Sequence, residues 1–213
     1  MTDRTRIRRL PDKAVTDRSV LDAILDEGLV AHVGIVDDGH PFVVPVGYAR
    51  RGDEVIMHGS SASRLFRSLA GGSPACVQVT LLDGLVYARS TFESSMNYRS
   101  ATILGSARRL TGDDELDALR ALTEHLLPGR WQEARHPSKK ERAATLTVAM
   151  PLTEWSVKVG DGGPDDLPED LETEPWCSIW AGRVPIAQVL LPAVTDPAVP
   201  EGVQVPNYVK ERA

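Results

Sequence analysis

Asp-Gly turns separate short apolar runs in the first half of this chain, and they constrain the fold more than any other feature. An Asp-Asp-Gly turn lies between the runs 29–36 and 41–48, and an Asp-Gly pair lies between 75–82 and 85–90. Glycine supplies the positive φ that a tight connection needs, so each pair of runs predicts a β-hairpin.

The rest of the pattern favours a mainly β protein. Further strands are predicted at 55–58, 98–110 and 143–159, and helices at 17–27, capped by Thr16, at 62–70 and at 113–126. A doubly wound parallel sheet would need a helix between most strand pairs, and this chain has too few. We therefore expect an antiparallel β-barrel with helices, closed or nearly closed, of about six strands.

Composition predicts one domain with two appended segments. The 213 residues are 42% hydrophobic, which is enough for one substantial core. Residues 1–14 form a polar, basic arm, and 15–160 form the barrel. Residues 161–213 begin with an acidic, proline-containing connector and continue into an apolar segment. Because that segment carries Trp176 and Trp180, we expect it to pack on the barrel or on a dimer partner.

Charge and cysteine usage argue against several classes of function. With 24 basic and 30 acidic residues the formal charge is -6, which argues against a nucleic-acid partner. Cys76 and Cys177 lie far apart, so neither a disulfide framework nor a metal site is expected. The N-terminus lacks an apolar signal region and no segment approaches about 18 apolar residues, so we expect a cytoplasmic protein that does not bind membranes.

Residues 55–69 place a strand, a small-residue turn and an amphipathic helix in succession. We interpret Ser61 as the helix cap. Helix N-termini attract anions, so Ser60, Ser63 and Arg64 would surround a phosphate with hydroxyls, backbone donors and a guanidinium. An ordinary capped surface helix explains the same pattern.

Three further features are candidates for binding. Pro45 interrupts a predicted strand and cannot donate to a sheet, so either a planar heteroaromatic ligand faces it or the strand is an edge strand. The polar segment 89–100 is either a solvated loop or a pocket wall, in which Arg89 and Arg99 would recognise an anion or a carbonyl. His58 ends the strand that leads into the proposed phosphate turn, whereas the other histidines are interpreted as structural or solvated. No HExxH, CxxC, GxSxG or Walker pattern supports a hydrolase or a nucleoside triphosphatase.

Several of these segments together resemble a known family. They are HVGIVDDGHPFVVPVGYARRGDEVIMHGSSASRL, LDGLVYARS, SMNYRS, LPGRW and IWAGRVPI, in this order. Over residues 15 to 190 the chain resembles the pyridoxamine-phosphate-oxidase-like split-barrel flavoproteins, in particular their nitroimidazole-resistance (Nim) and flavin-nucleotide-binding branch. The resemblance implies a six-stranded antiparallel FMN-binding split barrel that forms a homodimer, with two flavin sites at the subunit interface.

The resemblance also implies a set of cofactor-binding residues. Val44, Pro45 and Val46 would line the isoalloxazine ring, His58, Gly59 and Ser60 would follow the ribityl chain, and Ser63 and Arg64 would hold the phosphate. Arg99 and Ser100 would lie where a strand returns past the flavin, and Trp180 near the site. Many relatives carry a pair of histidines where this chain has Glu93-Ser94.

The expected function is therefore that of an FMN-dependent oxidoreductase. Its flavin would take a hydride from a reduced nicotinamide or deazaflavin donor and pass electrons to a small organic acceptor. His58, Glu93 and Tyr98 are the candidate catalytic residues. The alternative is a flavin- or haem-binding carrier or sensor without turnover of its own.

Overall fold

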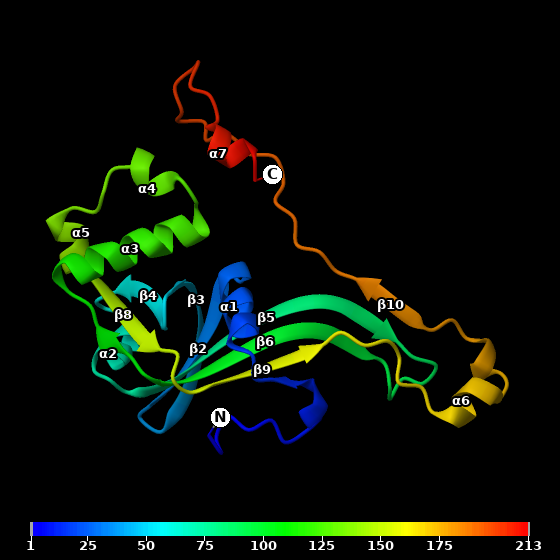
Figure 1. Cartoon of the computed structure of the whole chain (residues 1–213). Coiled ribbons are helices and arrows are strands. Elements are labelled where there is room, and N and C mark those ends of the chain that lie inside the picture. The colour runs from blue at the N-terminus through cyan, green and yellow to red at the C-terminus, as the bar shows by residue number, and fades with distance from the viewer. Residues whose placement is uncertain (1, 213) are drawn as a thin grey trace.

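The computed structural model describes residues 2–212, over which ten strands form one antiparallel sheet (Figure 1). The strand order is β1-β9-β6-β5-β2-β3-β4-β8-β7, and β10 pairs with β5 outside this path. The strands are β1 (Ala14–Val15), β2 (Val30–Asp37), β3 (His40–Arg51), β4 (Glu54–Ser60), β5 (Pro74–Tyr87), β6 (Ser95–Ser106), β7 (Arg108–Arg109), β8 (Thr145–Pro151), β9 (Trp155–Gly160) and β10 (Gly182–Pro185). The predicted mainly β class is confirmed. In the described part of the chain, strand pairing does not close the sheet into a full barrel, because the path ends at β1 and at β7.

The three predicted helices are present, but two of their caps were predicted wrongly. The helices are α1 (Arg18–Glu27), α2 (Arg64–Ala70), α3 (Gly112–Leu126), α4 (Arg130–Glu133), α5 (Lys139–Ala143), α6 (Pro168–Glu172) and α7 (Asn207–Lys210). Asp17, and not Thr16, caps α1 by accepting from the backbone N–H of Ser19 at 2.8 Å. Ser63, and not Ser61, caps α2. The Ser61 N–H donates instead to the Ala144 carbonyl at 2.9 Å, so that residue ties the turn to the start of β8.

The first predicted hairpin is confirmed and the second is wrong. β2 and β3 pair from Asp37↔His40 to Val30↔Gly47 around the expected turn. Asp83-Gly84, however, lies inside the single strand β5, which pairs with β6 on both sides of a bulge between Leu82 and Gly84. A bulge uses the same backbone freedom as a turn, so a local Asp-Gly signal does not distinguish the two.

The predicted closing strand at 143–159 is two strands that serve different halves of the sheet. β8 pairs with β4 and β7, whereas β9 pairs with β6 and β1. The chain turns at Leu152, whose N–H donates to the Asp53 carbonyl at 2.8 Å. One continuous apolar stretch therefore supplies a strand to each half.

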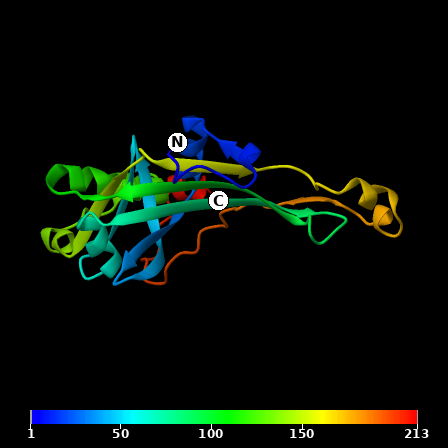
Figure 2. The ribbon, with the colours of Figure 1, turned by 90° about the horizontal axis from the view of Figure 1, so that it is seen from below.

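The core lies where α1 and α2 pack against the inner face of the sheet. Leu21, Ile24 and Leu25 of α1 are fully buried there with Val33 and Val77 of the strands. A second, smaller core lies under α3. β5 and β6 continue past both cores and run side by side into a protruding wing, which makes the molecule elongated (Figures 1 and 2).

Both terminal segments contact the sheet. Arg4 pairs with Glu154, and β1 joins the edge of β9. The C-terminal segment pairs with the wing through β10 and ends in α7, where Tyr208 bonds to Arg130 beside α4. None of the described helices is long and apolar enough to cross a membrane.

Candidate functional site

β3 and β4 separate halfway along their length, and the separation creates the central feature of the site. They pair only from Arg51↔Glu54 to Tyr48↔Met57. Beyond that point β3 has β2 as its only strand neighbour in residues 2–212, and β4 has only β8. The edge of β3 over 41–47, which contains Pro45, is therefore free of a second strand, as expected for a residue that cannot donate to a sheet.

The strand alternation divides the predicted ring-binding residues between the two faces of β3. Pro45 is opposite His32 on the outer face, and Val44 is opposite the buried Val33 on the inner face. Val44 nevertheless keeps 39% of its surface exposed, because no strand covers the free edge. An exposed apolar edge beside unpaired backbone groups suits a flat aromatic ligand that also hydrogen-bonds.

The turn after β4 is shaped by a glycine. A Cβ at Gly59 would lie 2.2 Å from the ring of Phe66, so only glycine lets α2 pack against β4 at this point. Ser60 Oγ accepts from the Ala62 N–H at 3.2 Å, and Ser63 Oγ accepts from the Phe66 N–H at 3.5 Å. Both hydroxyls thus stabilise the turn, and their remaining hydrogen-bonding capacity faces a surface where Ser61 and Ala62 are exposed.

Arg64 lies between the turn and the β2–β3 hairpin. Its Nε is 3.3 Å from Asp37 Oδ2, and its guanidinium stacks over the Phe42 ring at 4.5 Å. More than half of its side chain is exposed, so four of its five N–H donors remain available for an anion. Sequence reasoning missed Phe42 and Asp37, because nothing in the local pattern indicates that the hairpin tip reaches α2.

His58 faces away from this edge. It is opposite Thr147 on the face of β4 that is turned toward α3 and α5, where it lines a pocket with Leu119 and Arg142. Its partly covered position lowers the pKa of the imidazole, because desolvation disfavours the charged form. His58 therefore favours the neutral state at pH 7.

Arg99 and Arg89 are already engaged by carboxylates of the same chain. Arg99 donates to both oxygens of Glu27, at 2.6 and 2.8 Å, and to both oxygens of Asp83, at 3.0 and 2.8 Å. These bonds raise the pKa of Arg99 further above its already high value. Arg89 pairs with Asp166 at 2.6 Å. Both arginines fasten segments to one another, and four of the five donors of Arg99 are occupied.

The remaining predicted residues lie on the wing, and one chain does not bring them to the β3 edge. Glu93 lies in the loop at the tip of the wing between β5 and β6, and Tyr98 and Ser100 lie on β6 (Figure 1). Trp180 packs beside Tyr87, with 5.6 Å between the ring centroids. The predicted site is thus in two parts, one at β3, β4 and α2, and the other on the wing.

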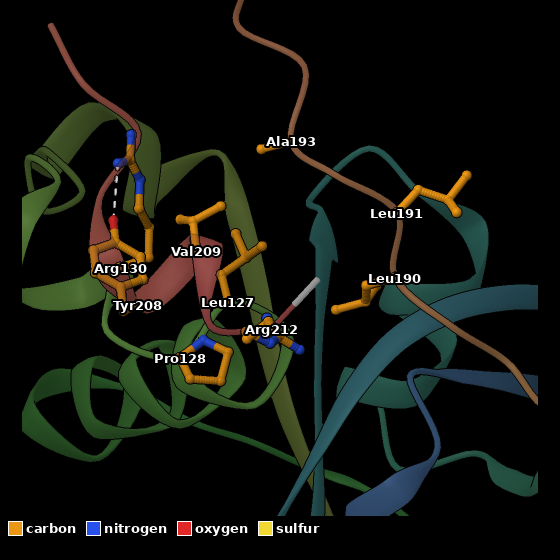
Figure 3. Close-up of a pocket in the computed structure, with 9 residues that line it drawn as sticks. All are labelled: Leu127, Pro128, Arg130, Leu190, Leu191, Ala193, Tyr208, Val209 and Arg212. Atoms are coloured by element: carbon orange, nitrogen blue, oxygen red, sulfur yellow. Dashed lines mark hydrogen bonds between the residues drawn. The ribbon is translucent and has the colours of Figure 1, made fainter.

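Two larger cavities lie elsewhere, under the C-terminal segment. A groove of about 1040 Å³ runs between α1, β5 and residues 186–190. An apolar pocket of about 320 Å³ lies where α7 returns to the loop after α3, and there the Tyr208 hydroxyl accepts from Arg130 at 3.3 Å (Figure 3). Neither cavity is lined by residues of the β3 edge or the α2 turn.

Comparison with known proteins agrees with this architecture. Residues 17–159 match the family model described as pyridoxamine 5'-phosphate oxidase. A search of curated protein sequences gave no match.

Three solved structures are similar. The FAD and haem binding protein from Mycobacterium smegmatis is 43% identical, with a TM-score of 0.89, over 94% of this chain and 97% of that one. The flavocytochrome Anf3 from Azotobacter vinelandii is 38% identical, with a TM-score of 0.92, over 100% and 97% of the two chains. A Bacteroides thetaiotaomicron protein described as a 5-nitroimidazole antibiotic resistance protein is 20% identical, with a TM-score of 0.58, over 68% and 86%, and this likeness concerns the fold alone.

Proposed function

Because this chain belongs to the pyridoxamine 5'-phosphate oxidase family, we propose that it is a flavin-dependent oxidoreductase whose flavin lies along the free edge of β3. The observation that carries the proposal is the separation of β3 from β4, which leaves an apolar, proline-containing edge without a second strand. Two relatives above 35% identity, described as an FAD and haem binding protein and as a flavocytochrome, support a flavin ligand.

The residues at this edge have separate tasks. Val44, Pro45 and Val46 hold the ring, the backbone of 58–60 follows the ribityl chain, and Ser63 with Arg64 binds the first phosphate. When bound, the flavin supplies the electron transfer between a reduced nicotinamide or deazaflavin donor and a small organic acceptor. The protein excludes water from the ring and neutralises the phosphate charge.

A homodimer would unite the two parts of the site. The outer face of β2 and β3 is apolar and bare, since Val36 is 65% exposed and Val43 67% exposed. An exposed apolar patch of this kind is typical of an interface. If two copies pair through this face, the wing of one copy, with Glu93, Tyr98, Arg99, Ser100 and Trp180, can approach the β3 edge of the other.

We also propose haem binding as a second candidate function, which the descriptions of the two closer relatives support. Three of the five histidines, His40, His125 and His136, bond to backbone carbonyls at 2.8 to 3.1 Å. In residues 2–212, His32 and His58 have no such bond, so their ring nitrogens are the available iron ligands. His32 lies on the exposed apolar face opposite Pro45.

An absorption spectrum of the purified protein tests both functions. A flavin spectrum that is bleached by a nicotinamide or deazaflavin donor is expected for the oxidoreductase. A colourless protein that does not bind added FMN or FAD would contradict the flavin proposal. A flavin that no donor reduces would favour a carrier. A Soret band that disappears in His32→Ala or His58→Ala would identify a haem ligand, and its persistence in both variants would exclude both residues.

A further inference from the structure

A separate pocket lies beside the proposed phosphate turn. It has a volume of about 280 Å³ and is lined by His58, Leu119, Arg135, Pro137, Glu141, Arg142 and Thr145. This volume is near the lower end of the range of small-molecule sites, which begins at about 300 Å³. The flavin proposal above leaves this pocket without a ligand.

The pocket and the turn share one wall. Ser60 is paired with Thr145, and His58 is paired with Thr147, on one face of the β4–β8 ladder. Thr145 lines the pocket, whereas Ser60 opens the turn that leads to Ser63. Because strands rise about 3.3 Å per residue, the turn and the position of His58 are separated by about 7 Å. A ligand bound at the turn therefore needs to extend only a short way to enter the pocket.

The shared wall contains an unsatisfied polar group. Thr147 is 1% exposed, and its Oγ1 has no hydrogen-bond partner in the described part of the chain. A buried hydroxyl without a partner costs free energy, so such groups usually have a ligand or water nearby. The hydroxyl lies on the same face as His58 and Thr145, both of which line the pocket.

The rim of the pocket is basic and held in place. Its segment 135–142 carries four cations, Arg135, Lys139, Lys140 and Arg142, against the single acid Glu141. Arg142 is fixed to the largely buried Glu115 at 2.7 Å through Nη2, which leaves Nη1 without a partner in residues 2–212.

An aromatic pair fixes the other side of the rim. The His136 ring stacks on Trp131, with 4.5 Å between the centroids and 22° between the planes. Since His136 lies between Arg135 and Pro137, this stack sets the position of both neighbours. A guanidinium and a proline ring are flat surfaces on which a nucleobase can lie.

We propose that this pocket binds the adenylate half of FAD, so that the cofactor is FAD and not FMN. This inference rests on the proposed flavin site, since the first phosphate at Ser63 and Arg64 places the second phosphate on the wall formed by Ser60 and Thr145. Arg142 Nη1 and the Thr147 hydroxyl supply hydrogen-bond donors inside the pocket, and the adenine lies against Arg135 and Pro137.

The test compares FAD and FMN on protein freed of its flavin. We expect FAD to bind at least about tenfold more tightly than FMN, because only FAD fills the pocket. Arg135→Glu is expected to weaken FAD binding about tenfold and to leave FMN binding unchanged, and added AMP is expected to compete with FAD but not with FMN. Arg130→Glu is the matched control, because it too removes an exposed arginine paired with a glutamate, outside this pocket. Arg135→Gln with an unchanged melting temperature serves as the second variant if Arg135→Glu fails to fold.

The outcomes separate this inference from the function it rests on. Equal affinities for FMN and FAD would overturn the adenylate site and leave the flavin proposal standing. Loss of FMN and FAD affinity together in Arg135→Gln would also overturn it, as would displacement of AMP by NADH without any preference for FAD. Failure of the unmodified protein to bind either flavin would overturn both.

Discussion

Arg64 and Arg99 show that residue type alone does not identify a phosphate ligand. Both were predicted to contact the flavin. Arg99 donates four hydrogen bonds to Glu27 and Asp83, so binding an anion would require it to give up existing partners. Arg64 has one ion pair at 3.3 Å and a stacking contact with Phe42, which orients the guanidinium and leaves most of its donors available. Arg64 is therefore the better phosphate ligand.

Removal of the Arg64 guanidinium should weaken flavin binding. Arg64→Ala is expected to lower the affinity by about 1.5 to 3 kcal/mol, the value of a hydrogen bond to a charged group. Fluorescence titration with FMN measures this loss. Arg67→Ala, which removes the exposed arginine in the last turn of the same helix, should change the affinity little. Equal affinities of Arg64→Ala and the unmodified protein would show that the phosphate lies elsewhere.

The bond to Arg99 makes the contribution of Glu27 dependent on pH. Hydrogen bonding to Arg99 lowers the pKa of Glu27 below its usual 4.5. The stabilisation is therefore complete above pH 4.5 and is lost as the pH falls through the lower folded-state pKa. Glu27→Gln should reduce the free energy of unfolding by about 0.5 to 1 kcal/mol at pH 7, and the difference should shrink toward about pH 3.

Urea unfolding of both proteins at the two pH values measures this difference. Glu172→Gln on α6 removes an exposed carboxylate for which residues 2–212 provide no ion pair, and it should give no such trend. A difference between Glu27→Gln and the unmodified protein that stays constant with pH would contradict the assignment.

At the scale of elements, the bulge in β5 decides how the C-terminal segment attaches. The bulge lies between Leu82 and Gly84, and Gly84 is opposite Pro185 of β10. A Cβ at Gly84 would lie 3.0 Å from the Val184 carbonyl oxygen and 3.4 Å from Pro185 Cα. Glycine at this position therefore permits the close approach of β10.

A methyl group at residue 84 should loosen β10. Gly84→Ala is expected to speed amide exchange in 182–185 and to increase proteolysis of the C-terminal segment, while the core keeps its stability. Mass-spectrometric hydrogen exchange measures this locally. Gly162→Ala is the control, because a Cβ there meets nothing within 4 Å. Unchanged exchange in β10 of Gly84→Ala would show that backbone shifts accommodate the methyl group.

At the scale of the whole molecule, one chain divides its candidate residues between the β3 edge and the wing. The bare apolar face of β2 and β3 offers a surface through which two copies could bring these parts together. A charge on that face should then weaken both the dimer and flavin binding, since burial of an unpaired carboxylate is costly.

Val43→Glu tests the dimer directly. We expect light scattering to show the mass falling from that of a dimer toward that of a monomer, with loss of bound flavin. Val194→Glu serves as the control, because it adds the same charge at an apolar residue that is 95% exposed in the C-terminal segment. A dimer that survives Val43→Glu with its flavin would place the interface on another face.

The amino-acid sequence by itself determined the mainly β class, the first hairpin, the positions of α1, α2 and α3, and the candidate turn at 58–64. These depend on periodicity and on glycine, which act over a few neighbouring residues. Only the tertiary structure decided that Asp83-Gly84 forms a bulge, that 143–159 divides between two sheet halves, and that Arg99 is saturated by Glu27 and Asp83. Each of these depends on partners far away in the chain, and local pattern carries no information about which distant segments will pair.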